Sequence, residues 1–177
     1  HFSDRCDIEC KNGGTVVESN CNCKCIYGFD GKNCEQLSRR KFFTDASCGV
    51  YEKEHGLISL STYPRSQTNA IFCQWLIKSQ SGKTIEFYVK DLDLDGENMP
   101  PNTPCNDFFY IWGAKSILNP ISCNKSAEEN LIGIRFESDS DWLLIELRTN
   151  PWSDQPHRGP QIKYRQIDAP YQRCLFL

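Results

Sequence analysis

The chain has 177 residues, a formal net charge of -3 and 11 cysteines. This length suits one ordinary domain, or a medium domain together with a very small one. The slightly negative charge gives no sign of a general nucleic-acid-binding surface, so no nucleic-acid partner is expected. No apolar run approaches the ~18 residues that a membrane-spanning helix needs, so no membrane span is expected either.

The cysteines indicate the compartment. Six of them fall between Cys6 and Cys34, a stretch too short to bury a sufficient core. Either disulfides or zinc would account for this density. The Cys-x-Cys-x-Cys run at Cys21, Cys23 and Cys25 lacks the Cys-x2-Cys spacing of common zinc knuckles, so disulfides are favoured. Because disulfides persist in oxidising compartments, the protein is expected to be secreted and extracellular.

Residues 6–34 form the first unit. The chain reads Cys-x3-Cys-x-Asn-Gly-Gly from Cys6, then Cys-x-Cys-x8-Cys with an internal Gly-Phe-x-Gly. This pattern resembles the EGF-like fold, and the insertion of residues 15–20 before Cys21 resembles the EGF-like module in the tails of astacin metalloproteases. Six cysteines allow 15 pairings. The resemblance implies three of these pairs, namely Cys6–Cys21, Cys10–Cys23 and Cys25–Cys34.

The following segment is polar and basic, with Phe42 and Phe43 embedded in it. It is interpreted as a linker or a docking segment. The expected boundaries are an EGF-like module at residues 1–35, a linker at 36–47, a larger domain at 48–168 and a tail at 169–177.

Beyond Cys48, short alternating or apolar runs are separated by turn residues. Runs of this length and spacing favour a β-sandwich over helices or βαβ units. In the run around Trp75, the pattern Cys-x-Trp-x-Ile predicts a half-buried strand with Gln74 and Leu76 on the second face. The runs lie at residues 56–60, 71–77, 84–89, 108–112, 131–136, 142–147 and 161–167.

The same region carries an ordered set of motifs: Cys48-Gly49, Tyr63-Pro64, Cys73-x-Trp75-x-Ile77, Cys105-x-Asp107, Cys123 and Phe136-x-Ser138-Asp139. This set resembles CUB domains over roughly residues 48–167. The resemblance implies a jelly-roll-like antiparallel sandwich with the disulfides Cys48–Cys73 and Cys105–Cys123. The expected fold class is therefore all-β, with a small disulfide-rich EGF-like module followed by a CUB-type jelly-roll sandwich.

The CUB resemblance also implies a calcium site, because Asp93, Asp107 and Asp139 correspond to the three acidic ligands of calcium-binding CUB domains. Calcium takes six to eight oxygen ligands, and this trio can supply the anionic part. The alternative is that such aspartates solubilise loops or cap turns, which is the interpretation favoured for Asp91 and Asp95. In calcium-binding CUB domains the ordered acidic loop engages a Lys or Arg, so the expected partner is an extracellular protein that presents a basic side chain.

No residue set predicts catalysis within this chain. A zincin helix needs His-Glu-x-x-His, and the histidines are isolated at His1, His55 and His157. Oxidised cysteines are not nucleophiles, and no Gly-x-Ser-x-Gly elbow is present. The sequon Asn124-Lys125-Ser126 predicts a glycan on Asn124.

Cys174 remains once ten cysteines are paired. A leftover cysteine indicates an intermolecular bridge, a partner in another domain or a free thiol. A disulfide-linked oligomer through Cys174 is therefore one open possibility.

The order of an EGF-like module before a CUB domain resembles the noncatalytic tail of a secreted astacin-family zinc metalloprotease. That resemblance implies a role in substrate or partner recognition, with zinc confined to a protease domain outside this chain. The alternative is a free-standing secreted EGF–CUB binding protein or host-directed effector with no protease domain. Complement-type serine proteases fit less well, since there a CUB domain usually precedes the EGF module.

Overall fold

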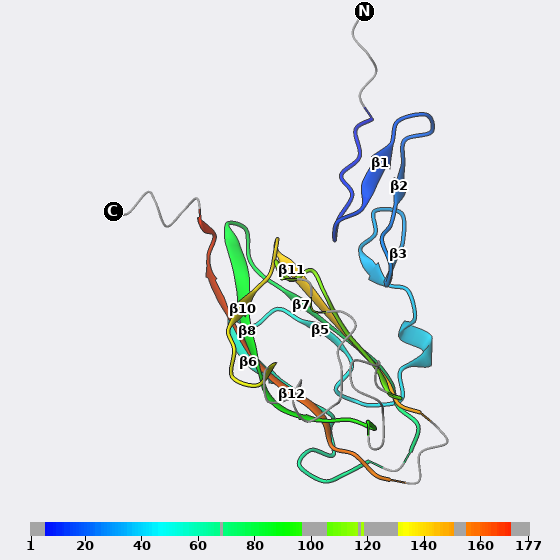
Figure 1. Cartoon of the computed structure of the whole chain (residues 1–177). Helices are drawn as coiled ribbons and strands as arrows, with labels where there is room; N and C mark the ends of the chain where they lie inside the picture. Colours follow the sequence, from blue (N-terminus) through cyan, green and yellow to red (C-terminus); the bar gives the residue numbers. More distant parts are fainter. Residues whose placement is uncertain are drawn as a thin grey trace, which may run out of the picture. The chain divides into compact units, whose positions relative to one another are not determined.

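The computed structural model describes residues 6–67, 69–96, 106–116, 118, 131–150 and 155–170 (Figure 1). The chain divides into two compact units, His1–Lys41 and Phe42–Leu177. Each unit is described by itself.

The first unit is a disulfide-rich pair of hairpins. Strand β1 (Thr15–Val17) pairs antiparallel with β2 (Asn22–Lys24), and β3 (Phe29–Asp30) pairs antiparallel with β4 (Gln36–Leu37). Since so little apolar surface is buried in a unit of this size, cross-links must supply much of its stability. The disulfides join Cys6 to Cys21, Cys10 to Cys23 and Cys25 to Cys34, the pairs that the EGF-like resemblance implies.

The segment expected to be a linker belongs largely to the two units. Its first residues form β4, which pairs with β3 inside the first unit. A short 3-10 helix, η1 (Arg40–Phe42), follows. Further along, the ring of Phe43 stacks on Phe72 with centroids 6.2 Å apart, and the Thr44 amide donates to the Phe72 carbonyl. Residues 42–44 therefore fit the interpretation as a docking segment better than the interpretation as a free linker.

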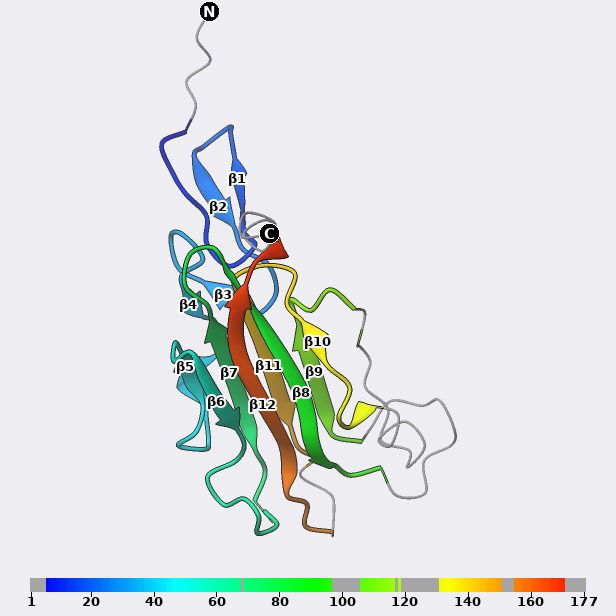
Figure 2. The same ribbon diagram turned by 90° about the vertical axis from the view of Figure 1, so that its left-hand side faces the viewer.

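The second unit is a sandwich of two four-stranded sheets, seen as two layers in Figure 1, while Figure 2 looks onto the sheet that holds β6, β12, β8 and β10. One sheet has the order β10-β8-β12-β6 and the other β5-β7-β11-β9. All pairings are antiparallel except that of β5 with β7. The strands are β5 (Gly49–Tyr51), β6 (His55–Ile58), β7 (Phe72–Lys78), β8 (Lys83–Asp93), β9 (Phe108–Trp112), β10 (Phe136–Glu137), β11 (Trp142–Arg148) and β12 (Gly159–Asp168). The predicted order, a disulfide-rich module and then an all-β sandwich, is confirmed.

The core lies between the two sheets. Trp75 is fully buried, and its indole Nε1 donates to the Ser47 hydroxyl at 3.0 Å. The Cys48–Cys73 disulfide ties the start of β5 to β7 across 25 residues. In the chain-entropy account such a cross-link contributes about 3 kcal/mol by restricting the unfolded chain.

The prediction that β7 is half-buried is wrong, because both of its faces are covered. Gln74 is 0% exposed and Leu76 is 1% exposed, although both point away from the core. The strand lies between β5 and β11, and Gln74 donates to the Glu146 carboxylate at 2.7 Å. This bond satisfies the amide nitrogen of Gln74, whereas its buried Oε1 has no hydrogen-bond partner among the described residues.

The strand predicted at residues 131–136 is also wrong, since only Phe136 lies in a strand, at the start of β10. Ile132 makes an isolated bridge with Val89, and Gly133 follows at a φ of 79°. A strand cannot continue through that conformation, and Ile134 is left 48% exposed.

Candidate functional site

Carboxylates gather where β8 ends, β9 begins and β12 begins. The last residue of β8, Asp93, is the register partner of Gly159, the first residue of β12. This pairing brings residues on both sides of Gly159 to the end of β8. We define the carboxylate cluster as Asp91, Asp93, Asp95 and Asp107 with the two nitrogen-bearing side chains of His157 and Arg158.

Asp107 joins the strand ends. It is 3% exposed, its Oδ2 accepts the Asp95 amide at 2.9 Å and its Oδ1 accepts the Asn150 amide at 2.7 Å. Burial raises the pKa of Asp107, and these two backbone donors offset that effect only in part. The site therefore holds a carboxylate whose negative charge a nearby cation would stabilise.

His157 and Arg158 contact the carboxylates from the β12 side. His157 Nδ1 lies 3.1 Å from Asp93 Oδ1, and His157 Nε2 lies 3.9 Å from Asp95 Oδ1. The Arg158 amide donates to Asp93 Oδ2 at 2.8 Å. Among the described residues, the buried Nε2 of His157 has no hydrogen-bond partner. The cluster is thus polar and only partly satisfied.

The interpretation of Asp91 and Asp95 as loop-solubilising residues is wrong. Asp91 accepts hydrogen bonds from the Tyr63 hydroxyl at 2.8 Å and from Arg158 Nε at 3.2 Å. Burial raises the pKa of Asp91, but Arg158 and Tyr63 together hold it below its ordinary value. Asp95 is only 8% exposed. Both residues are structural members of the cluster.

A small pocket opens inside the cluster, with a volume of about 20 Å³. This volume is enough for one water-sized species. Two predicted ligands, Asp93 and Asp107, line it together with Thr149, Asn150 and His157. The walls therefore combine two carboxylates with hydroxyl, amide and imidazole groups and the apolar side chain of Leu60.

Asp139, the third predicted ligand, is not in this pocket. Its amide donates to the Gly113 carbonyl at 2.7 Å, immediately after β9, and its side chain is exposed. Asp107 immediately precedes β9, so a five-residue strand separates the two positions, a span of roughly 17 Å. Within the described ranges, no three His, Cys, Asp or Glu residues are arranged to hold a metal ion. The three predicted ligands thus do not converge.

The sequence reasoning missed five residues of the site: Asp91, Asp95, Asn150, His157 and Arg158. The period-two alternation of a strand places Asp91, Asp93 and Asp95 on one side, and this signal could have identified Asp95. His157 is 64 residues away from Asp93, and no local pattern connects them.

Some predicted sites lie outside the described residues. These are the Cys105–Cys123 disulfide, the sequon at Asn124 and the leftover Cys174. They stay predictions. In the part of the chain that the structure describes, no helix is long and apolar enough to cross a membrane.

Known proteins resemble the chain in both of its units. The family model for the CUB domain matches residues 48–151. The zinc metalloproteinase nas-36 of Brugia malayi is 25% identical over 171 residues, which span 93% of this chain and 27% of that protein. Fibropellin-1 of Strongylocentrotus purpuratus is 32% identical over 91 residues, spanning 49% of this chain and 8% of that protein. The chain thus spans about a quarter of the length of the metalloproteinase and less than a tenth of the length of fibropellin-1.

Solved structures share the fold. The CUB1-EGF-CUB2 region of human MASP-1/3 superposes with a TM-score of 0.54 at 18% identity, covering 90% of this chain and 55% of that one. The MASP-1 CUB2 domain bound to Ca2+ gives a TM-score of 0.51 at 22% identity, covering 67% of this chain and 98% of that one. Since the family model spans more than half of the sequence and the second unit is the sandwich that this family implies, the chain belongs to the CUB domain family.

Proposed function

We propose that this chain is the noncatalytic, extracellular interaction region of a secreted astacin-like zinc metalloprotease. One observation carries the proposal: the alignment with the Brugia metalloproteinase runs through both units and covers 93% of the chain. A match to the CUB domain alone would not distinguish a protease tail from other extracellular proteins. The disulfides in both units suit that oxidising environment.

In this function the chain recruits a protein substrate or partner to a protease domain that lies N-terminal to it. Catalytic zinc belongs to that other domain. The surface of the present chain would hold the substrate close to the protease, so that cleavage gains from a raised local concentration.

We further propose that the carboxylate cluster binds Ca2+ through Asp93 and Asp107. The fit rests on the small pocket that the carboxylates of Asp93 and Asp107 both line, and on the raised pKa of the buried Asp107. Calcium takes oxygen ligands from carboxylates, carbonyls and water, and Asp95, Thr149 and Asn150 add such oxygens nearby. Bound calcium would offset the negative charge and order the strand ends, while the outer carboxylates would face a Lys or Arg of the partner.

Sequencing the complete transcript tests the assignment to a protease. We expect it to encode a His-Glu-x-x-His segment N-terminal to the EGF-like unit, because that helix carries the zinc ligands of the astacin-like domain. A complete transcript without this segment would overturn the proposal. It would favour the alternative of a free-standing EGF–CUB binding protein.

A further inference from the structure

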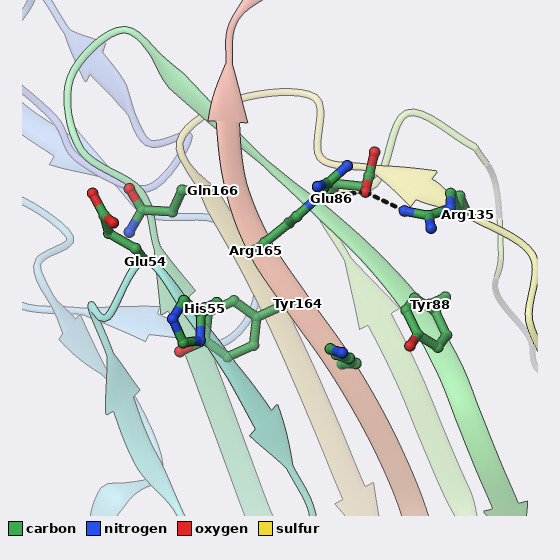
Figure 3. A pocket seen from close by; sticks show the side chains of 9 residues that line it. Glu54, His55, Glu86, Tyr88, Arg135, Tyr164, Arg165 and Gln166 are labelled. Atoms are coloured by element: carbon green, nitrogen blue, oxygen red, sulfur yellow. Dashed lines mark hydrogen bonds and ion pairs between the residues drawn. The ribbon is translucent and has the colours of Figure 1, made fainter.

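A second charged surface lies away from the carboxylate cluster, on the outer face of the sheet β10-β8-β12-β6. It is hollowed by a pocket of about 470 Å³. We call this surface the cationic groove, and Figure 3 shows its side chains on neighbouring strands. Its central residues are His55, Glu86, Tyr88, Arg135, Lys163 and Arg165.

Strand register brings these residues together. Arg165 on β12 lies opposite Glu86 on β8 and opposite His55 on β6. Two residues earlier, Lys163 lies opposite Tyr88 on β8. Since side chains two apart on a strand share a face, Lys163 and Arg165 both point outward from the sheet. The central residues of the groove therefore lie on strands, except Arg135, which directly precedes β10.

One carboxylate is already held in the groove. Arg165 Nε donates to Glu86 Oε1 at 2.8 Å, and Arg135 Nη1 donates to the same oxygen at 2.7 Å (Figure 3). The bond from Arg165 lowers the pKa of Glu86, and Arg135 adds to the effect against the opposing influence of burial. Glu86 is thus charged at neutral pH. A guanidinium has five N–H donors, so each arginine keeps donors for another acceptor.

The groove retains positive charge after this pairing. Lys163 is exposed and forms no ion pair with any residue that the structure describes. At the rim, Glu54 pairs with Lys83 at 3.5 Å, and these two charges cancel. The rest of the groove has a net charge of +2, because it holds three cationic side chains and one carboxylate. The cations are Arg135, Lys163 and Arg165, and the carboxylate is Glu86. This local excess is opposite in sign to the net charge of -3 on the whole chain.

We propose that the cationic groove binds an acidic side chain of a protein partner. The geometry around Glu86 shows that a carboxylate fits between these cations, and Lys163 is placed to receive a second one. Tyr88 beside Lys163 and Leu57, which is 49% exposed on β6, offer apolar contact to a peptide. A sulfated glycan fits less well, because the acidic Glu54 and Glu86 interrupt the positive charge that a long polyanion needs.

The test uses the whole chain and a hexaglutamate peptide, followed by heteronuclear NMR, with hexaglutamine as the matched neutral probe. We expect hexaglutamate to shift the backbone signals around Lys163 and Arg165, and added salt to weaken the binding because exposed ion pairs are screened. Lys163→Gln should weaken the affinity about fivefold, the upper value for one exposed ion pair. This variant removes no intramolecular ion pair, so its fold should be retained.

Lys90→Gln is the control, since it removes the same charge from β8 outside the groove. It should bind hexaglutamate as the wild type does. Binding that is absent, equal for both peptides or equally weakened by both substitutions would overturn the proposal. Tighter binding of a heparin hexasaccharide through Lys163 would also overturn it, because the partner class would then be a sulfated glycan.

Discussion

Asp107 connects two segments of the chain within the carboxylate cluster. Its two oxygens accept backbone amides from Asp95 and Asn150, which follow β8 and β11. Without those acceptors, two amide donors near the interior would lose their partners. The residue therefore couples two strand ends to the pocket that we assign to calcium.

Asp107→Ala should lower the free energy of unfolding by about 2 to 3 kcal/mol, because two N–H donors lose their acceptors. The same substitution should abolish the rise in Tm that calcium produces in the wild type, since an ion that binds the native state stabilises it by mass action. Calorimetry with and without calcium measures both effects.

Asp139→Ala is the matched control for this substitution. The Asp139 side chain is exposed at the opposite end of β9, so the change in stability should stay within about 0.5 kcal/mol. Its calcium response should equal that of the wild type. Identical responses in Asp107→Ala and wild type would contradict the calcium proposal.

Glu86 gives a prediction about pH. Its folded-state pKa is depressed below the ordinary 4.5. It therefore contributes stability above that pH, and the contribution is lost as the pH falls through the folded-state pKa. Glu86→Gln should lower the free energy of unfolding by about 1 kcal/mol at pH 7. The effect is small because both arginines are largely exposed and solvent screens the ion pairs. The difference from wild type should shrink towards zero near pH 2 in urea unfolding experiments.

The control for Glu86→Gln is Glu54→Gln. Glu54 has a single exposed ion pair with Lys83, so a smaller loss is expected at pH 7. A gap between wild type and Glu86→Gln that stays constant from pH 7 to pH 2 would show that the arginine pairs contribute no stability.

At the scale of elements, strands rich in β-branched and aromatic residues were predictable. Residues 108–112 were expected as a strand and form β9. The run at 84–89 was found, but β8 continues to Asp93 because it pairs with β12 through a register shift at Gln161/Ile162. The end of β8 alternates aspartate with leucine but lacks the β-branched and aromatic residues on which the prediction relied. The pairing of this end depends on β12, which is distant in sequence.

The candidate site shows the same limit. Asp93 and Asp107 were predicted ligands and line one pocket, but Asp139 lies elsewhere. Sequence position within a motif does not tell which end of a strand a residue reaches. His157 enters the cluster only because β12 begins beside the end of β8.

The edge strand β6 depends on a close approach that only glycine permits. A Cβ at Gly56 would lie 2.9 Å from the ring and hydroxyl of Tyr164, which is almost fully buried on β12. Gly56→Ala should therefore destabilise the sandwich by about 1 to 3 kcal/mol through overpacking.

Val50→Ala is the control for Gly56→Ala, since Val50 is 55% exposed on β5, an edge strand of the other sheet. Its Tm should change little. An unchanged Tm in Gly56→Ala would show that Tyr164 has room to move.

At the scale of the whole molecule, each unit has its own disulfides and its own sheets. The second unit presents two surfaces of opposite charge, the carboxylate cluster at one end of the sandwich and the cationic groove on an outer sheet face. The second unit can therefore contact a basic group of a partner at the carboxylate cluster and an acidic group at the cationic groove. This arrangement suits a region that recruits proteins.

We propose that this region directs an astacin-like protease to its protein substrate. The most direct measurement compares kcat/KM of the full-length protease with that of the same protease lacking this region. Removing the region should lower kcat/KM on the folded protein substrate about tenfold or more, which corresponds to about 1.4 kcal/mol of lost binding free energy. On a short peptide, which reaches only the active site, kcat/KM should not change. Equal losses on both substrates, or none on either, would contradict the account.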